Sequence, residues 1–248
     1  MTKRAAVPSL FTICNLFCGF LSIYYASQGH LVPASWLIVI AGFLDAFDGK
    51  IARLFDDGSD DGQFGLQFDS LADVCSFGFA PAVLMLHYFE PLLHIRWLPF
   101  LVAFVYLLCG ALRLARFNVH HDVDDEGEDA VKPDFIGLPI PVAAATLASY
   151  IIFSQLVWES TREPHVALSL CAFVAFLMMS PFDYPSFPRF TFETARDRFR
   201  LALSFGAIVI VVVANEEAFF PVALTFCLSG AIRWLVHIVT DREVADIH

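Results

Sequence analysis

Long apolar stretches recur along the chain, and short polar segments that hold most of its charges separate them. Each stretch is about 15 to 22 residues long, close to the length that a helix needs to cross the hydrocarbon core of a bilayer. The pattern predicts eight membrane-spanning helices, at residues 8–28, 33–53, 68–88, 97–117, 138–157, 165–181, 201–215 and 218–239. We therefore expect an all-α, polytopic membrane bundle in which residues 1–248 form a single membrane-embedded domain.

Positively charged residues lie mostly on one side of these predicted helices. With the N-terminus inside, thirteen of the 15 Lys and Arg residues fall in cytoplasmic segments, and Arg96 and Arg162 fall on the opposite side. Because cytoplasmic loops are enriched in Lys and Arg, this asymmetry predicts an integral protein of the cell membrane with both termini in the cytoplasm. The basic and then apolar N-terminus shows no clear cleavage site, so we interpret it as the first membrane helix rather than a signal peptide.

Composition supports this class of protein and argues against others. Hydrophobic residues make up 58% of the 248 residues, including 27 Phe, which is too apolar for a soluble domain. The formal net charge of −11 argues against nucleic acid as a partner. The six cysteines all lie in apolar segments without a CxxC pair, so we interpret them as small buried side chains rather than disulfides or zinc ligands.

Four aspartates lie at the ends of two predicted helices, at a depth where carboxylates need partners. Asp45 and Asp48 follow the apolar run WLIVIAGFL, and Asp69 and Asp73 precede the run VCSFGFAPAVLML. Residues three or four apart share a helix face, so each pair points in one direction. Two antiparallel helices joined by residues 54–64 would therefore present four carboxylates to one pocket, which we expect at the cytoplasmic face.

The chemistry of such a pocket follows from its ligands. Oxygen-only ligands select hard cations such as Mg²⁺ or Mn²⁺, and carboxylates shared between two ions can clamp a phosphoryl group during in-line displacement. Gly49, Ala52 and Gly65 lack bulk on the same face and would let a charged substrate approach the helix backbones. Taken singly, an Asp at a helix end is usually a solvated cap and a small residue a packing contact, so the order of these residues carries the hypothesis.

That order resembles the signature of the CDP-alcohol phosphotransferase family, D-x2-D-G-x2-A-R-x8-G-x3-D-x3-D. Every signature position between residues 45 and 73 is filled, by Asp45, Asp48, Gly49, Ala52, Arg53, Gly65, Asp69 and Asp73. Eleven residues separate Arg53 from Gly65, where the signature has eight. We expect the additional Asp- and Gly-rich residues to lengthen the loop without moving the helices.

The resemblance implies transfer of a phosphatidyl group from a CDP-linked lipid to an alcohol, with release of CMP. It implies two divalent cations, Mg²⁺ or Mn²⁺, held by Asp45, Asp48, Asp69 and Asp73. Asp73, at the edge of the cluster, could also take the proton of the incoming hydroxyl group. The implied nucleotide site comprises Gly49, Ala52, Arg53 and Gly65. The resemblance also implies that two copies of the chain pair as a homodimer in membrane lipid.

Three other strings resemble the phosphatidylserine synthase branch of the family: PSLFTICNLFCGF, LRLARFNV with FIGLPIP, and YPSF. They favour L-serine as the acceptor and CDP-diacylglycerol as the donor. Thr12 and Asn15 in the first string share a helix face, and they either form interhelical hydrogen bonds or line the nucleotide pocket. Arg113 and Arg116 in the second lie one turn apart, and they either snorkel to the interface or hold the serine carboxylate or a lipid phosphate.

Two other functions remain open on the sequence alone. Within the family, the acceptor could be glycerol phosphate, inositol phosphate or another alcohol. Outside it, intramembrane carboxylates also mark cation transporters and proton relays. A transporter should carry polar groups near the middle of several spans and show repeat symmetry, whereas the acids here cluster at one face and the helices of residues 201–239 follow as a C-terminal addition.

Overall fold

The computed structural model describes residues 6–55, 60–89, 97–124, 135–158, 164–184 and 216–245. Its helices are α1 (Ala6–Ser27), α2 (Leu31–Phe55), α3 (Asp60–Asp73), the π-helical η1 (Val74–Phe79), α4 (Ala80–Phe89), α5 (Trp97–Asp124), α6 (Ile140–Trp158), α7 (Pro164–Met179), the 3₁₀ turn η2 (Glu216–Ala218) and α9 (Phe219–Ala245). The strands β1 (Phe135–Ile136) and β2 (Asp183–Tyr184) form one antiparallel pair. The predicted helical architecture is confirmed, with this strand pair as an addition.

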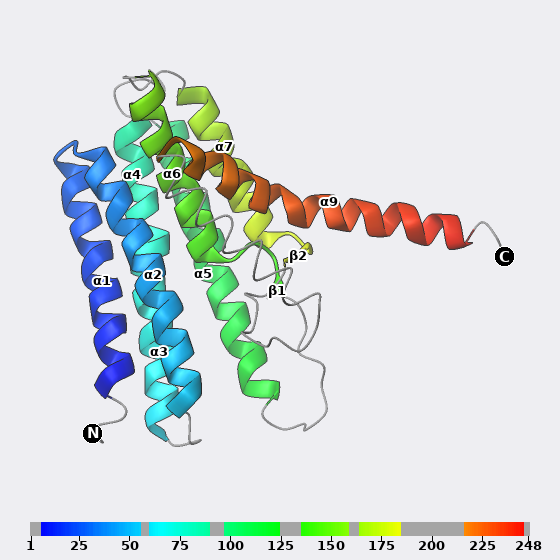
Figure 1. Cartoon of the computed structure of the whole chain (residues 1–248), viewed down its shortest axis with the longest axis horizontal. Coiled ribbons are helices and arrows are strands. Elements are labelled where there is room, and N and C mark those ends of the chain that lie inside the picture. Colours follow the sequence, from blue (N-terminus) through cyan, green and yellow to red (C-terminus); the bar gives the residue numbers. More distant parts are fainter. Residues whose placement is uncertain are drawn as a thin grey trace.

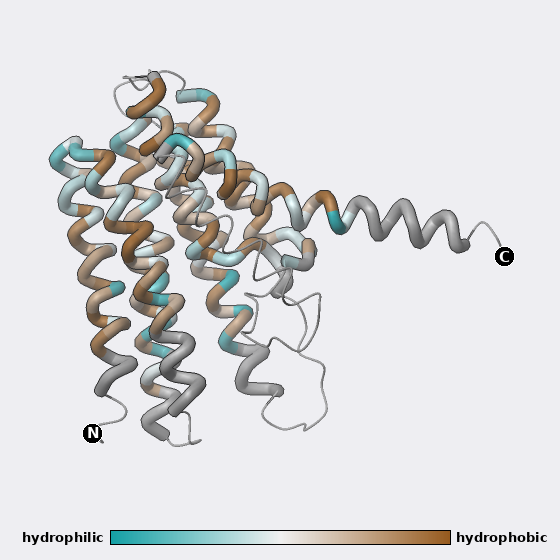
Figure 2. The backbone as a smooth tube through the Cα atoms, in the orientation of Figure 1, coloured by the Kyte–Doolittle hydropathy of each residue, from teal (hydrophilic) through white to brown (hydrophobic). Residues whose placement is uncertain are grey.

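Four helical segments within the described residues are long and apolar enough to cross a membrane, and apolar residues run along them in Figure 2. These segments are Leu10–Ser27, Gln67–Phe89, Trp97–Asn118 and Ile140–Val157. Three shorter apolar helices are Leu31–Phe47, Pro164–Met179 and Phe219–Trp234. The protein is therefore an integral membrane protein, although the number of eight spans stays a prediction. The expected span 201–215 lies outside the described residues.

Helix α1 shows how the bundle is arranged relative to its surroundings. Its outward face carries large, exposed apolar side chains at every third or fourth position: Leu10, Ile13, Phe17, Phe20 and Tyr24. Its buried face carries Thr12, Asn15 and Ser22. This arrangement suits lipid outside and helix neighbours inside, because helices in a bilayer associate through close packing and hydrogen bonds rather than through burial of apolar surface from water.

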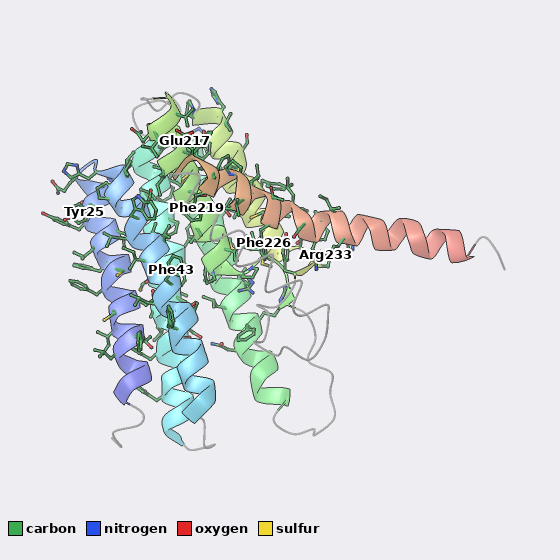
Figure 3. All side chains as sticks on the ribbon, in the orientation of Figure 1. Tyr25, Phe43, Glu217, Phe219, Phe226 and Arg233 are labelled. Atoms are coloured by element: carbon green, nitrogen blue, oxygen red, sulfur yellow. The ribbon has the colours of Figure 1, made fainter. Side chains whose placement is uncertain are left out.

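Helix α9 differs in direction from the bundle. Helices α1 to α7 run alongside one another, whereas α9 crosses them and projects away (Figure 1). Phe219 and Phe226 lie on the half of α9 that overlies the bundle, and Arg233 lies where α9 leaves it (Figure 3). The ring of Phe219 stacks on Trp36 of α2, with centroids 6.4 Å apart. The prediction of a span at 218–239 therefore falls on a helix that packs across the bundle.

The connection between α2 and α3 is shorter than the predicted loop of residues 54–64. Helix α2 continues to Phe55 and α3 already begins at Asp60, so those loop bounds were wrong. The missed signal is the acidic pair Asp60 and Asp61, since acidic residues are favoured in the first turn of a helix. Seven of the eleven residues 54–64 are therefore helical.

A π-helical turn follows directly after Asp73. Pro81 has no N–H group, so the carbonyl of Phe77 lacks its usual donor four residues later. The hydroxyl of Tyr106 on α5 donates to that carbonyl at 2.8 Å, and both residues are fully buried. The neighbouring helix thus satisfies a backbone group that the proline leaves open. Single π-helical turns are frequent at functional sites.

The strand pair joins two segments that are far apart in sequence. Phe135 pairs with Tyr184 and Ile136 with Asp183. At the following turn, Gly137 has a φ of 84°, and its N–H donates to the carbonyl of Phe182 at 2.9 Å. The FIGLPIP string and the start of the YPSF string therefore lie together beside the end of α7.

Replacing Gly137 with Ala should destabilise the protein more than the same change at Gly29. Both glycines have positive φ, which disfavours any L side chain by about 1–2 kcal/mol. A Cβ atom at Gly137 would also collide with the carbonyl oxygen of Met178, whereas one at Gly29 would meet nothing within 4 Å. We expect the free energy of unfolding to fall by about 3 kcal/mol in Gly137→Ala and by about 1 kcal/mol in Gly29→Ala, as measured by thermal unfolding in detergent. Equal losses would contradict the tight turn.

Candidate active site

Three of the four predicted aspartates lie together. Asp45 comes from α2 and Asp69 and Asp73 from α3, and one carboxylate oxygen of each lies within 4.8 Å of the others. Asp45 and Asp69 are half-buried, and Asp73 is only 7% exposed. At an effective dielectric of about 20, two ionised carboxylates at that distance repel by about 3 kcal/mol. The cluster therefore needs positive charge close by, from basic side chains, bound cations or protons.

The chemistry of the donor atoms fits a metal site. The three groups are carboxylates from two helices, and hard divalent cations such as Mg²⁺ and Mn²⁺ prefer oxygen ligands. Predicted site residues with side chains outside the described part of the structure are Asp48, Gly49, Ala52 and Arg53, all on α2. Gly65 lies on α3, and a Cβ atom there would meet nothing within 4 Å, so this position offers open space.

Helix α1 supplies a polar contact to the cluster. Asn15 is fully buried, and its Nδ2 donates to Asp73 Oδ1 at 3.2 Å. Thr12, three residues earlier, is also buried. The interhelical hydrogen bond that the sequence left open is therefore present, and it ends on an aspartate of the cluster. The other atom of the same amide, Asn15 Oδ1, is buried without a hydrogen-bond partner among the described residues.

The backbone of α1 is fixed at the same point. Ser76 Oγ on η1 donates to the main-chain carbonyl of Asn15 at 3.0 Å. Gly19 makes this approach possible, because a Cβ atom there would lie 2.5 Å from Ser76 Oγ and 2.7 Å from Ser76 Cα. The sequence reasoning did not find Ser76, which follows Asp73 by three residues and which the π-helical turn carries to α1.

The two predicted arginines have different environments. Arg113 on α5 is half-buried, and its positive charge interacts with Asp73. Its Nε has no hydrogen-bond partner among the described residues. Arg116 is exposed. The structure therefore associates one arginine of the pair with the carboxylate cluster and leaves the other at the surface.

A second polar contact ties α5 to α3, and sequence reasoning missed it. Ser70 Oγ lies 3.2 Å from Asn118 Oδ1, and Asn118 Nδ2 lies 3.0 Å from Ser70 Oγ. Ser70 directly follows Asp69, and Asn118 belongs to the LRLARFNV string. The hydrogen bonding therefore holds the helix with Arg113 against the helix with two of the aspartates.

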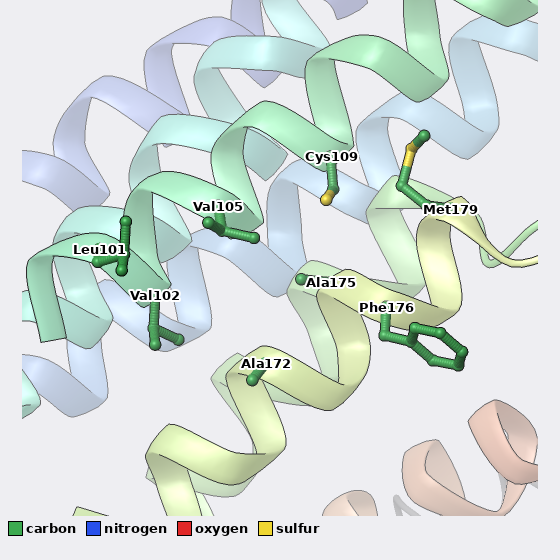
Figure 4. Close-up of a pocket in the computed structure, with 8 residues that line it drawn as sticks. All are labelled: Leu101, Val102, Val105, Cys109, Ala172, Ala175, Phe176 and Met179. Atoms are coloured by element: carbon green, nitrogen blue, oxygen red, sulfur yellow. The ribbon is translucent and has the colours of Figure 1, made fainter. Parts of the chain in front are cut away.

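An apolar groove of about 380 Å³ runs between α5 and α7 (Figure 4). It is lined by Leu101, Val102, Val105, Cys109, Ala172, Ala175, Phe176 and Met179. Cys109 precedes Arg113 by one helical turn. The lining carries no acid, base or amide, so the polar cluster around Asp73 is the candidate for chemistry.

Comparisons with known proteins give a consistent result. The family model for CDP-alcohol phosphatidyltransferase matches residues 5–181. A CDP-diacylglycerol–serine O-phosphatidyltransferase of Helicobacter pylori is 34% identical over 229 residues, covering 92% of this chain and 90% of the relative. One of Methanocaldococcus jannaschii is 34% identical over 94% of this chain and 96% of its own. The archaetidylserine synthase of Methanothermobacter thermautotrophicus is 36% identical over 75% of this chain and 72% of its own.

Mn²⁺ or Mg²⁺ should raise the thermal unfolding midpoint of the purified protein. A ligand that binds only the folded state stabilises it by about 2.7 kcal/mol at one hundred times its Kd. The variant Asp69→Asn keeps the shape of the side chain but removes a negative charge, so it should lose most of this shift. Glu217→Gln removes an exposed carboxylate on η2 and should keep it. An undiminished shift in Asp69→Asn would rule out this metal site.

Proposed function

Because the chain belongs to the CDP-alcohol phosphatidyltransferase family, we propose that it transfers the phosphatidyl group of CDP-diacylglycerol to the hydroxyl of L-serine. The products are phosphatidylserine and CMP. The family resemblance of the sequence is thereby confirmed. The single observation that carries the proposal is the cluster of Asp45, Asp69 and Asp73, located where the family signature places its aspartates, in a chain whose similar proteins bear the name of this reaction.

The reaction is a substitution at the phosphorus atom that carries the diacylglycerol. The serine hydroxyl oxygen forms a new bond to this phosphorus, and the bond from phosphorus to the oxygen of CMP breaks, so CMP leaves with the electron pair. Asp73 accepts the proton of the attacking hydroxyl. Its carboxylate suits this role because the hydrogen bond from Asn15 to Asp73 Oδ1 fixes the orientation of the side chain.

The metal proposal extends the observed cluster by one residue. Asp45, Asp69 and Asp73, with Asp48 as the fourth ligand, would hold two divalent cations, Mg²⁺ or Mn²⁺. When bound, such ions neutralise the charge of the pyrophosphate and polarise the phosphorus under attack. The protein's own contribution is to hold the carboxylates of Asp45, Asp69 and Asp73 together on two helices before the substrate arrives.

The remaining positions divide between the two parts of the lipid nucleotide. Arg53, with the small residues Gly49, Ala52 and Gly65, would seat the cytidine diphosphate, with Thr12 of α1 beside it. The open space at Gly65 supports this assignment. The acyl chains would remain in the bilayer along the apolar outer faces of the helices. Arg113 is the candidate for an anionic group of the acceptor or lipid, and the exposed Arg116 is a candidate for the lipid phosphate.

We also propose the arrangement of the protein in the membrane. Residues 1–248 form one domain with its active site at the cytoplasmic face, both termini lie in the cytoplasm of the cell, and two copies pair as a homodimer. The distribution of Lys and Arg residues supports the orientation, and the family resemblance supports the dimer. Light scattering in detergent should give twice the chain mass of 27.6 kDa after correction for detergent. A monomer mass would remove the dimer from the proposal.

Purified protein should release CMP from CDP-diacylglycerol only when both L-serine and Mn²⁺ or Mg²⁺ are present. A chelator should abolish the release. Asp73→Asn should lower kcat by about 10²- to 10⁴-fold, because it removes the proton acceptor, while Glu217→Gln should keep the wild-type rate. The ether-linked counterpart of the lipid belongs in the same assay, since no residue assigned here distinguishes the two chain types.

The same assay with other alcohols in place of serine separates the acceptor from the mechanism. Release with glycerol phosphate or inositol phosphate in place of serine would keep the mechanism and overturn the acceptor. Folded protein that shows no metal-dependent release with any acceptor would overturn the proposed function.

A further inference from the structure

On helices α1 and α5, two buried polar atoms of residues that interact with Asp73 lack a hydrogen-bond partner among the described residues. One is an acceptor, Oδ1 of the fully buried Asn15, and the other is a donor, Nε of Arg113. Buried polar atoms are nearly always paired in native proteins, so an unpaired atom needs an explanation such as a ligand, an ion or water. Here one acceptor and one donor belong to side chains that both interact with the same carboxylate.

The Asn15 amide is not free to turn away from this place. Its Nδ2 is engaged with Asp73 Oδ1 at 3.2 Å, and Ser76 holds the main chain of the same residue at 3.0 Å. Oδ1 belongs to the same planar amide as Nδ2, so it is held beside the Asp73 carboxylate. A ligand that donates a hydrogen bond to Oδ1 must therefore bind next to the proposed proton acceptor.

We propose that Asn15 Oδ1 accepts a hydrogen bond from the ammonium group of the acceptor serine, while Arg113 binds the serine carboxylate and the hydroxyl faces Asp73. This inference rests on the proposed function. Serine carries one cationic donor group and one anionic acceptor group on the carbon next to its hydroxymethyl group. The unpaired acceptor of Asn15 and the unpaired donor of Arg113 complement the two charged groups of serine. Glycerol phosphate and inositol phosphate carry no ammonium group, so Asn15 would select against them.

The same oxygen could instead receive the amino group of cytosine, since one sequence-based interpretation placed Asn15 in the lining of the nucleotide pocket. Both sources share one chemistry, an N–H donor bound beside Asp73. Serine is favoured because Asn15 bonds directly to the carboxylate that takes the serine proton, so the reacting hydroxyl group and the adjacent ammonium reach the same place. The two sources predict different kinetic constants.

The test compares L-serine with two competitors that each lack one charged group. Glycerate keeps the hydroxyl and carboxylate but has no ammonium, and ethanolamine keeps the hydroxyl and ammonium but has no carboxylate. In Asn15→Leu, the KM for serine should rise about tenfold or more, since hydrogen bonds to charged groups are among the stronger ones. The inhibition constant of glycerate and the KM for CDP-diacylglycerol should stay unchanged. In Arg113→Met the pattern should reverse: the inhibition constant of glycerate should rise, and that of ethanolamine should stay unchanged.

Two further variants guard against loss of fold. Asn15→Asp is nearly isosteric and keeps an acceptor for the ammonium group but loses the donor to Asp73, so kcat should fall while the KM for serine stays the same or falls. Ser22→Ala removes another buried hydroxyl of α1, which donates to the carbonyl of Ala34 at 2.8 Å, and it should leave both KM values and both inhibition constants unchanged.

The remaining outcomes each refute a defined part. A rise in the KM for CDP-diacylglycerol with an unchanged KM for serine would assign Asn15 to cytosine and overturn the inference. A loss of kcat with all KM values and inhibition constants unchanged would reduce Asn15 to a positioning residue and also overturn it. A rise in the KM for serine in Asn15→Asp would also overturn the inference. Wild-type protein without serine-dependent CMP release would instead refute the proposed function, before any variant is compared.

Discussion

The constraint on which the rest of the structure depends is the placement of several carboxylates at one end of an apolar helix bundle. Asp45, Asp69 and Asp73 approach one another within 4.8 Å, at a distance where ionised groups repel strongly unless cations lie between them. Such an arrangement persists only if the helices that carry it are held by other contacts. Ser76 provides one to α1, and Ser70 provides another to α5. These two contacts therefore hold the neighbouring helices against the helix that carries Asp69 and Asp73.

Much of the site was predictable because it follows from local spacing. Asp69 and Asp73 are four residues apart and share a helix face whatever the rest of the chain does, and the apolar stretches identify the helices. Contacts between distant residues were not predictable in the same way. No sequence periodicity predicts that Tyr106 donates to the carbonyl of Phe77, which Pro81 leaves without a donor, or that Ser70 and Asn118, 48 residues apart, form a hydrogen bond. These contacts depend on how α3 and α5 pack, and packing depends on the whole bundle.

The α2–α3 connection shows the same limit at an element boundary. The Asp- and Gly-rich composition of residues 54–64 favours a loop, yet α3 begins at Asp60. Loop composition and a helix start share the same acidic residues, because a helix N-terminus attracts negative charge. Composition alone therefore could not separate the two, whereas the spacing of the aspartates beyond it was unaffected and still brought Asp69 and Asp73 to Asp45.

The first half of the C-terminal helix α9 packs on the bundle. The family model ends at residue 181, 38 residues before α9 begins at Phe219, which alone would allow α9 to be a separate addition. However, the Tyr184 hydroxyl donates to the carbonyl of Cys227 at 2.8 Å, and a Cβ atom at Gly230 would collide with the Tyr184 ring. Burial raises the pKa of the Tyr184 phenol and keeps it a donor. Since Tyr184 also pairs with Phe135 in the strand pair, this one residue connects α9 with the strand that leads into the Gly137 turn.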